Sequence, residues 1–225
     1  MEKPILFSTE MVKAILAGRK TMTRRVIKDK VFQEWQDVGF SSDFIKHPDN
    51  SWSKKCPYGQ VGDILWVRET WNVDSVNDHN KTMAIDFKAI QDGYHGAEVI
   101  RRFKPERYTQ FRKFYQKAGW QSSLFMPREA ARILLKVTNI RVERLQDITE
   151  TDAMDEGALR IPNTPEYQKA FDAAVAAKEK PPLGETPRQR FARLWDSLNT
   201  ERGYGWDLNP WVWVVEFERV KMEDK

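Results

Sequence analysis

The chain has 225 residues, of which 40% are hydrophobic and 31% charged, and this composition excludes an intrinsically disordered polypeptide. Its net charge of +4 permits a polyanionic partner without requiring one. The single cysteine, Cys56, excludes an intramolecular disulfide, and the longest apolar run, 211–217, is too short to cross a bilayer. We therefore expect a globular protein of the cytoplasm, without a secretory signal or a membrane segment.

The first predicted elements are a short strand and a helix. Residues 4–8 form an apolar, strand-like run, and Ser8 can cap a helix over 9–17. Gly18 can end that helix in the left-handed conformation that glycine adopts without strain. The next strand signal is 61–71, "VGDILWVRETW", in which a Gly-Asp turn precedes apolar residues on both faces. We expect this strand to be buried on both sides.

The middle of the chain, 74–125, shows no clear period and then becomes both basic and aromatic over 101–120. Cations mixed with flat rings are typical of a surface that binds single-stranded nucleic acid. Four aromatic rings in the middle of this stretch also follow helical spacing, which is typical of an amphipathic helix. An amphipathic helix is the commoner cause of such a pattern. Those rings are Tyr108, Phe111, Phe114 and Tyr115.

The C-terminal half shows strand signals at both ends and helix signals between them. Residues 131–145 are rich in β-branched side chains and predict a strand. Short strands scattered among helices predict an α+β fold, with a small mixed or closed β-sheet that carries insertions. The further elements expected are a short helix from Thr149 to Gly157, an Ala/Lys/Glu helix within 158–185, a helix over 186–199 capped by Thr186, and a final strand over 211–220.

Charge is segregated along the chain. Residues 19–30 carry six basic side chains and one acidic one, and 101–117 carry seven and one. Residues 143–156 show the reverse, with six acids and one arginine. This distribution predicts a basic face and an acidic patch.

Metal chemistry has little support in the sequence. The three histidines, His47, His79 and His95, lie far apart, and Cys56 has no second cysteine with which to bind zinc. A magnesium ion held by carboxylates stays an open alternative. We predict no metal site and no cofactor.

The segment "AGRKTMTRR", 17–25, holds a possible nucleophile pair. On an extended strand Lys20 and Thr23 would point to opposite faces, so they can meet only if the chain turns after Gly18. Given such a turn, a lysine whose pKa is lowered by burial or by neighbouring cations can take the threonine proton. A solvated basic turn is the alternative for this stretch taken alone.

Glu156 is the second residue of interest, because it falls in the last turn of its short helix, where the helix dipole disfavours negative charge. A carboxylate in that position is exposed, paired with a distant cation, or raised in pKa and able to act as an acid.

Both stretches together resemble one family. "GRKTMTRR" fits the G-x-K-x-x-T-x-R signature of ASCH domains, with Gly18, Lys20, Thr23 and Arg25 in register. "VGDILWV", "RLQDITETDAMDEG" and "WVWVVEFERV" resemble later segments of the same family, in the same order. The chain is similar to the longer, phage- and prophage-associated type and is about twice the length of the minimal domain.

The resemblance implies a PUA-like fold, a small β-barrel with flanking helices, in one domain over 1–225 with insertions near 27–60, 74–125 and 158–207. Small bacterial members are amidohydrolases acting on N4-acetylcytidine, and others are RNA-binding modules or ribonucleases. By motif, the lysine, threonine and glutamate of the amidohydrolases fall on Lys20, Thr23 and Glu156. A nucleoside or RNA is thus the expected partner, and the expected substrate or nucleic-acid contacts are Arg19, Arg24, Arg25 and Glu69.

Overall fold

The structure is a computed structural model that describes residues 1–28, 55–90, 99–115, 117, 119–158, 169, 173–174, 176–177 and 184–220. Most of the predicted insertion 27–60, and most of the predicted helix within 158–185, lie outside these residues. The chain divides into two compact units, which we treat separately. Unit 1 comprises Met1–Gly18, Lys54–Ile140 and Glu216–Lys225, and unit 2 comprises Arg19–Ser53 and Arg141–Val215.

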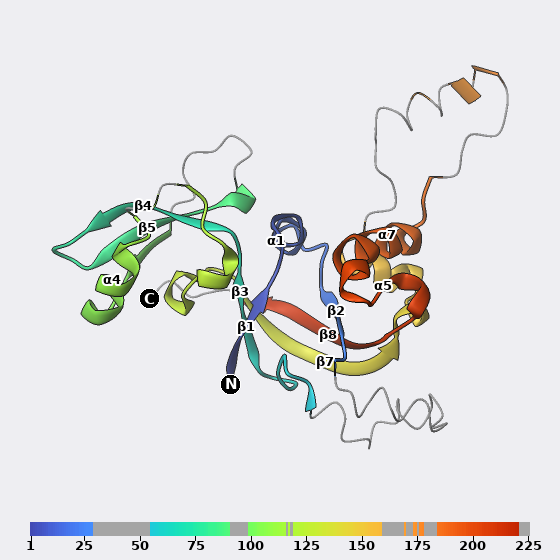
Figure 1. Ribbon diagram of the computed structural model, residues 1–225, viewed down its shortest axis with the longest axis horizontal. Helices are drawn as coiled ribbons and strands as arrows, with labels where there is room; N and C mark the ends of the chain where they lie inside the picture. The colour runs from blue at the N-terminus through green and yellow to red at the C-terminus, as the bar shows by residue number, and fades with distance from the viewer. Residues whose placement is uncertain are drawn as a thin grey trace. The chain divides into compact units, whose positions relative to one another are not determined.

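The described residues form both helices and strands, which are labelled in Figure 1. None of these helices is long and apolar enough to cross a membrane. In chain order they are β1 (Glu2–Leu6), α1 (Thr9–Leu16), β2 (Met22–Val26), β3 (Ile64–Arg68), β4 (Trp71–Asn77), β5 (Thr82–Phe87), β6 (Val99–Arg102), α4 (Pro105–Arg112), β7 (Leu134–Arg144), α5 (Glu150–Asp155), α7 (Pro187–Asn199) and β8 (Trp211–Val220).

The strands form two sheets, one of five strands in the order β1-β3-β7-β8-β2 and one of three in the order β4-β5-β6. Helices and sheets are both well represented, so the predicted α+β class is confirmed. The five-stranded sheet is open at β1 and β2, and the described strands form no closed barrel. The expectation of one ASCH domain with insertions stays a prediction.

The N-terminal elements of unit 1 follow the sequence signals closely. Ser8 Oγ accepts a hydrogen bond from Met11 N and caps α1, and Gly18 adopts the left-handed conformation at φ 69°. β1 pairs with β3 in parallel. Only one face of β3 is fully buried, through Leu65 and Val67, whereas its other side chains are half-exposed, so the expectation of burial on both faces is corrected.

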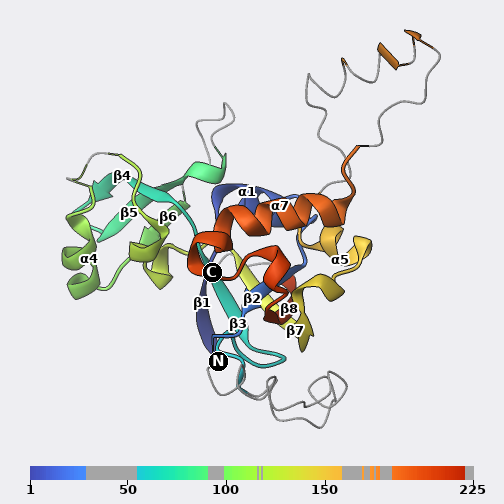
Figure 2. The same ribbon diagram turned by 45° about the vertical axis from the view of Figure 1, so that its right-hand side comes forward.

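The region 74–125, which shows no period in the sequence, contains most of the three-stranded sheet and α4. Two local features hide the strand alternation. The register of β4 shifts between Val73 and Ser75, as at a β-bulge, and β5 buries three successive residues, Met83 to Ile85. In Figures 1 and 2, α4 lies beside β4 and β5. The strands and α4 share one hydrophobic core, built around Trp71, Ile85 and Tyr108.

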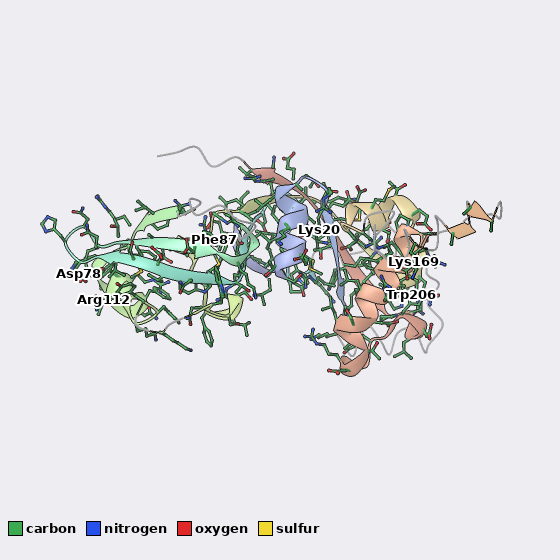
Figure 3. The ribbon with its side chains drawn as sticks, turned by 90° about the horizontal axis from the view of Figure 1, so that it is seen from above. Lys20, Asp78, Phe87, Arg112, Lys169 and Trp206 are labelled. Atoms are coloured by element: carbon green, nitrogen blue, oxygen red, sulfur yellow. The ribbon has the colours of Figure 1, made fainter. Side chains whose placement is uncertain are left out.

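The aromatic residues of α4 belong mainly to that core. Tyr108 and Phe111 are buried, Phe114 packs partly against them, and Tyr115 is exposed. The amphipathic-helix interpretation of 101–120 is therefore the one that the described residues support. On the outer side of the helix, Arg112 donates two hydrogen bonds to Asp78, at 2.8 and 2.9 Å, and both residues are labelled in Figure 3.

Unit 2 packs α5 and α7 together, as both Figure 1 and Figure 2 show, over a core that includes residues of β2 and β8. Met22 from β2 and Val212 and Val214 from β8 contribute to this core. From the helices, Ala153 of α5 meets Phe191 and Trp195 of α7, which lie four residues apart on one face. The core thereby fixes β2 against α5, the two elements that carry the candidate site.

The cap of α7 allows a direct test of how sequence signals stabilise this unit. Thr186 Oγ1 accepts a hydrogen bond from Gln189 N, and the Gln189 side chain accepts one from Thr186 N, forming a complete capping box. Replacing Thr186 with alanine should lower the free energy of unfolding by about 1 kcal/mol. Chemical denaturation measures this change, and a Thr200→Ala variant at the opposite end of the helix should lose less.

Candidate functional site

Lys20 is positioned by the turn after Gly18 and by a short pairing with the end of α5. Lys20 and Glu156 form an isolated antiparallel β-bridge, and Thr21 N donates to Asp155 O at 2.8 Å. The side chain of Lys20 is completely buried. A lysine in a solvated basic turn would be exposed, so the interpretation of this stretch as a solvated turn is wrong for Lys20.

Glu156 is held at the C-terminal end of α5 by signals that the sequence shows. Thr149 Oγ1 accepts from Asp152 N at 3.0 Å and begins the helix, and Gly157, at φ 95°, ends it. Glu156 itself is 8% exposed. A buried carboxylate at this end of a helix requires a cation to offset the helix dipole.

The cation is Lys20. Its Nζ donates to Glu156 Oε2 at 2.6 Å, to Glu156 O at 3.0 Å and to Met22 O at 2.8 Å. These three contacts fit an ammonium that donates three hydrogen bonds to a carboxylate and two carbonyls, and they equally fit a neutral amine that accepts the proton of a carboxylic acid. The predicted contact between Lys20 and Glu156 across more than a hundred residues of sequence is confirmed.

Burial lowers the pKa of Lys20 below its ordinary value. The Glu156 carboxylate opposes this effect, and the charges of Arg25 and Arg24 add to it. Lys20 is thus a cation that gives up its proton more readily than a solvated lysine does. Glu156 Oε2, at 2.6 Å from Nζ, is placed to accept that proton.

Arg24 lies on the same face of β2 as Met22, since side chains two residues apart share a face. It is fully buried, and its guanidinium donates to Asp152 Oδ2 at 2.6 Å, to Glu143 Oε2 at 3.2 Å and to Glu156 Oε1 at 3.5 Å. Arg24 was expected to contact substrate or phosphate. The structure instead makes it a partner of three carboxylates.

Sequence reasoning missed three members of this cluster, namely Arg141, Glu143 and Asp152. Arg141 bonds to Glu143, its neighbour on the same face of β7, and lies 3.3 Å from Asp152. The opposite charge of 19–30 and 143–156 was a signal that these segments meet. Nothing in the local pattern indicates which arginine pairs with which acid.

Thr23 follows Met22 on β2 and is 3% exposed. Because Lys20 Nζ bonds to Met22 O, the ammonium lies against the peptide that joins Met22 to Thr23. Strand alternation turns the Thr23 side chain to the face opposite Arg24.

The remaining predicted binding residues have different surroundings. Arg19 is exposed and Arg25 is half-exposed, both at the N-terminal edge of unit 2. Glu69 belongs to unit 1, where it is 1% exposed and accepts two hydrogen bonds from Arg132, at 2.9 and 2.8 Å. Burial raises the pKa of Glu69, and Arg132 opposes the rise. Arg132 also stacks over the Phe87 ring, labelled in Figure 3, at 4.2 Å.

In the part of the chain that the structure describes, no cluster of three or more His, Cys, Asp or Glu side chains is placed to hold a metal ion. No protein-family model, curated protein or solved structure matches this chain. The resemblance to ASCH domains therefore rests on sequence motifs alone, and the buried lysine with its carboxylate is the structural feature that bears on the chemistry.

Proposed function

We propose that this chain is a metal-independent amidohydrolase of the ASCH, PUA-like type, acting on an acylated nucleoside or nucleobase such as N4-acetylcytidine. The observation that carries the proposal is the buried Lys20–Glu156 contact, 2.6 Å from Nζ to Oε2. Moving one proton along this hydrogen bond converts an ammonium and a carboxylate into a neutral amine and a neutral carboxylic acid. The pair then contains both a base and an acid, while its net charge is unchanged.

The reaction follows from these two protonation states. The Lys20 amine takes the proton of the Thr23 hydroxyl as the Thr23 oxygen attacks the acyl carbonyl. The amide C–N bond breaks, Glu156 donates its proton to the leaving nitrogen, and the acyl group is left as an ester on Thr23. Water then hydrolyses the ester, which releases the carboxylic acid and restores the threonine.

Burial of the trio has two consequences for this scheme. Lys20, Thr23 and Glu156 are 2%, 3% and 8% exposed, so a proton exchanged within the pair is shielded from bulk water. A low local dielectric also strengthens the hydrogen bonds that orient the pair. For the same reason, substrate must displace neighbouring side chains to reach the threonine.

The test is release of cytidine from N4-acetylcytidine by the purified protein, followed by chromatography in the presence of a chelator. Lys20→Met, Thr23→Val and Glu156→Gln should each reduce turnover by at least about 100-fold, because each removes a proton-transfer group or the nucleophile. Lys136→Met is the matched control, since Lys136 is a half-exposed lysine in a surface ion pair, and its turnover should equal that of wild type. Turnover that persists in Lys20→Met and Thr23→Val would sink the assignment.

A non-catalytic RNA-binding module is the rival outcome, and the exposed Arg19 with the half-exposed Arg25 is the feature that favours it. Such a module would hydrolyse no acylated nucleoside. It would bind RNA with an affinity that falls steeply as salt rises, because bound phosphates release counterions. Arg25→Ala would weaken that binding and Thr23→Ala would not. Both assays use the same proteins, so one preparation decides between the two functions.

A further inference from the structure

Glu156 is held by two cations, one at each of its oxygens. Lys20 Nζ bonds to Oε2 at 2.6 Å, and Arg24 Nη1 lies 3.5 Å from Oε1. An arginine can only donate hydrogen bonds and keeps its charge in proteins. The positive charge beside Oε1 disfavours a proton on that oxygen, and Oε2 is the oxygen that faces Lys20, so a proton that leaves Lys20 is received on Oε2.

The charge that Arg24 presents to Glu156 is set by two further acids. Arg24 Nη2 contacts both Asp152 Oδ2, at 2.6 Å, and Glu143 Oε2, at 3.2 Å, which are closer than its contact with Glu156. Arg141 in turn bonds to both of these acids. In the described part of the chain, the pair and its charged neighbours form a cluster of three cations and three acids, and Arg25 acts on Lys20 as one cation more. The cations are Lys20, Arg24 and Arg141, and the acids are Glu143, Asp152 and Glu156.

We propose that Arg24 is a positioning residue for Glu156, and that Asp152 and Glu143 determine how readily the Lys20–Glu156 pair exchanges its proton. The inference rests on the proposed function only in that the proton exchange is taken to generate the catalytic base and acid. The charge coupling itself is a property of the folded chain and can be measured without substrate.

The direction of the coupling follows from electrostatics. Replacing Asp152 by asparagine keeps the shape of the side chain and removes one negative charge beside Arg24. The surroundings of the pair become more positive, so both protons of the pair are lost at lower pH than in wild type. The pair is active only when it holds one proton in total. The bell-shaped pH profile of kcat should therefore move toward acid as a whole, by about half to one pH unit.

The experiment records that profile for wild type, Asp152→Asn and Glu143→Gln, with cytidine release from N4-acetylcytidine as the readout. Glu150→Gln is the control, because Glu150 lies on the same helix, is exposed, and accepts a hydrogen bond from the backbone N–H of Arg188. Its profile should match that of wild type. Arg24→Lys keeps the positive charge but loses the guanidinium group that bonds to several carboxylates at once. The value of kcat should therefore fall, while the pH profile of kcat should keep its position on the pH axis.

A second measurement separates this inference from the proposed function. In protein labelled at the lysine side chains, the Lys20 Nζ signal is assigned with a Lys20→Arg variant and titrated by NMR. Asp152→Asn and Glu143→Gln should lower the midpoint of the Lys20 titration. If the midpoint shifts and no acylated nucleoside is turned over, the coupling holds and the amidohydrolase proposal fails. If turnover occurs and neither the midpoint nor the profile shifts in either variant, the coupling is overturned.

Discussion

Replacing Glu156 with alanine is expected to lower the free energy of unfolding by about 3–5 kcal/mol, because it leaves a buried ammonium without its anion. Lys20 would keep its bonds to two carbonyl oxygens, Met22 O and Glu156 O, neither of which carries a full negative charge. Asp155→Ala is the matched control, one residue earlier on the same helix end. Within the described part of the chain, Asp155 contacts Thr21 through its backbone carbonyl, which the substitution keeps, so the free energy of unfolding should change by no more than about 0.5 kcal/mol. Urea denaturation followed by circular dichroism measures both values.

The pH dependence of the Glu156→Ala effect has a definite sign. Burial already lowers the pKa of Lys20, and losing the Glu156 carboxylate lowers it further. In the variant, the folded-state pKa of Lys20 then lies below its pKa in the unfolded chain. The unfolded state therefore binds the Lys20 proton more tightly, and the resulting loss of stability is largest at pH values below the ordinary lysine range. The difference in free energy of unfolding between Glu156→Ala and wild type should therefore become smaller as the pH rises toward that range. A double Lys20→Met, Glu156→Leu variant should recover most of the stability, and a deficit as large as that of Glu156→Ala would contradict this explanation.

Removing the partner of Glu69 should be equally costly. Arg132→Met leaves a buried carboxylate unpaired and should lower the free energy of unfolding by about 3–5 kcal/mol at neutral pH. Arg128→Met is the control, because Arg128 makes the same two-bond contact with Glu2, at 2.7 and 2.9 Å, in an exposed setting. The exposed pair should contribute less than about 1 kcal/mol.

Acid should partly rescue Arg132→Met. Burial raises the pKa of Glu69 above its ordinary value, and replacing Arg132 removes the hydrogen bonds and the charge that oppose that rise. A carboxyl group whose pKa is raised in the folded state lowers the stability as the pH increases through that pKa. The difference between variant and wild type should therefore narrow as the pH falls toward the ordinary glutamate range. A difference that is constant with pH would show that lost packing on Phe87, and not the unpaired charge, is the cause.

Local signals in the sequence predicted the elements that depend on neighbouring residues. The caps at Ser8, Thr149 and Thr186 begin helices where they were expected, because a cap bonds to a backbone group two or three residues away. The strands at 134–144 and 211–220 were also found from composition. Each of these predictions needs only a short window of sequence.

The three-stranded sheet could not be predicted in the same way. Its strands are recognised through their pairing across the sheet, and the bulge in β4 breaks the alternation that would mark it. The closed barrel implied by the family resemblance is not found among the described strands. Closure depends on long-range pairing, which no local pattern reports.

The candidate site shows the same division. Lys20 and Glu156 were paired by the family motif and by the unfavourable position of a carboxylate at a helix end. The contacts of Arg24 with Asp152 and Glu143 depend on how β2, β7 and α5 pack, so a charged run in the sequence could indicate only that opposite charges meet. Arg24 was accordingly expected at a substrate surface and lies buried among acids.

The central claim is that the buried pair activates Thr23 as a nucleophile, and trapping the covalent intermediate tests it most directly. Wild-type protein is mixed with N4-acetylcytidine, quenched in acid within the first turnover, digested, and analysed by peptide mass spectrometry. We predict an acetyl ester on Thr23 that is formed in wild type and absent from both Thr23→Val and Lys20→Met. Cytidine release without acetylation of Thr23, or acetylation that persists when Lys20 is replaced by methionine, would contradict the account.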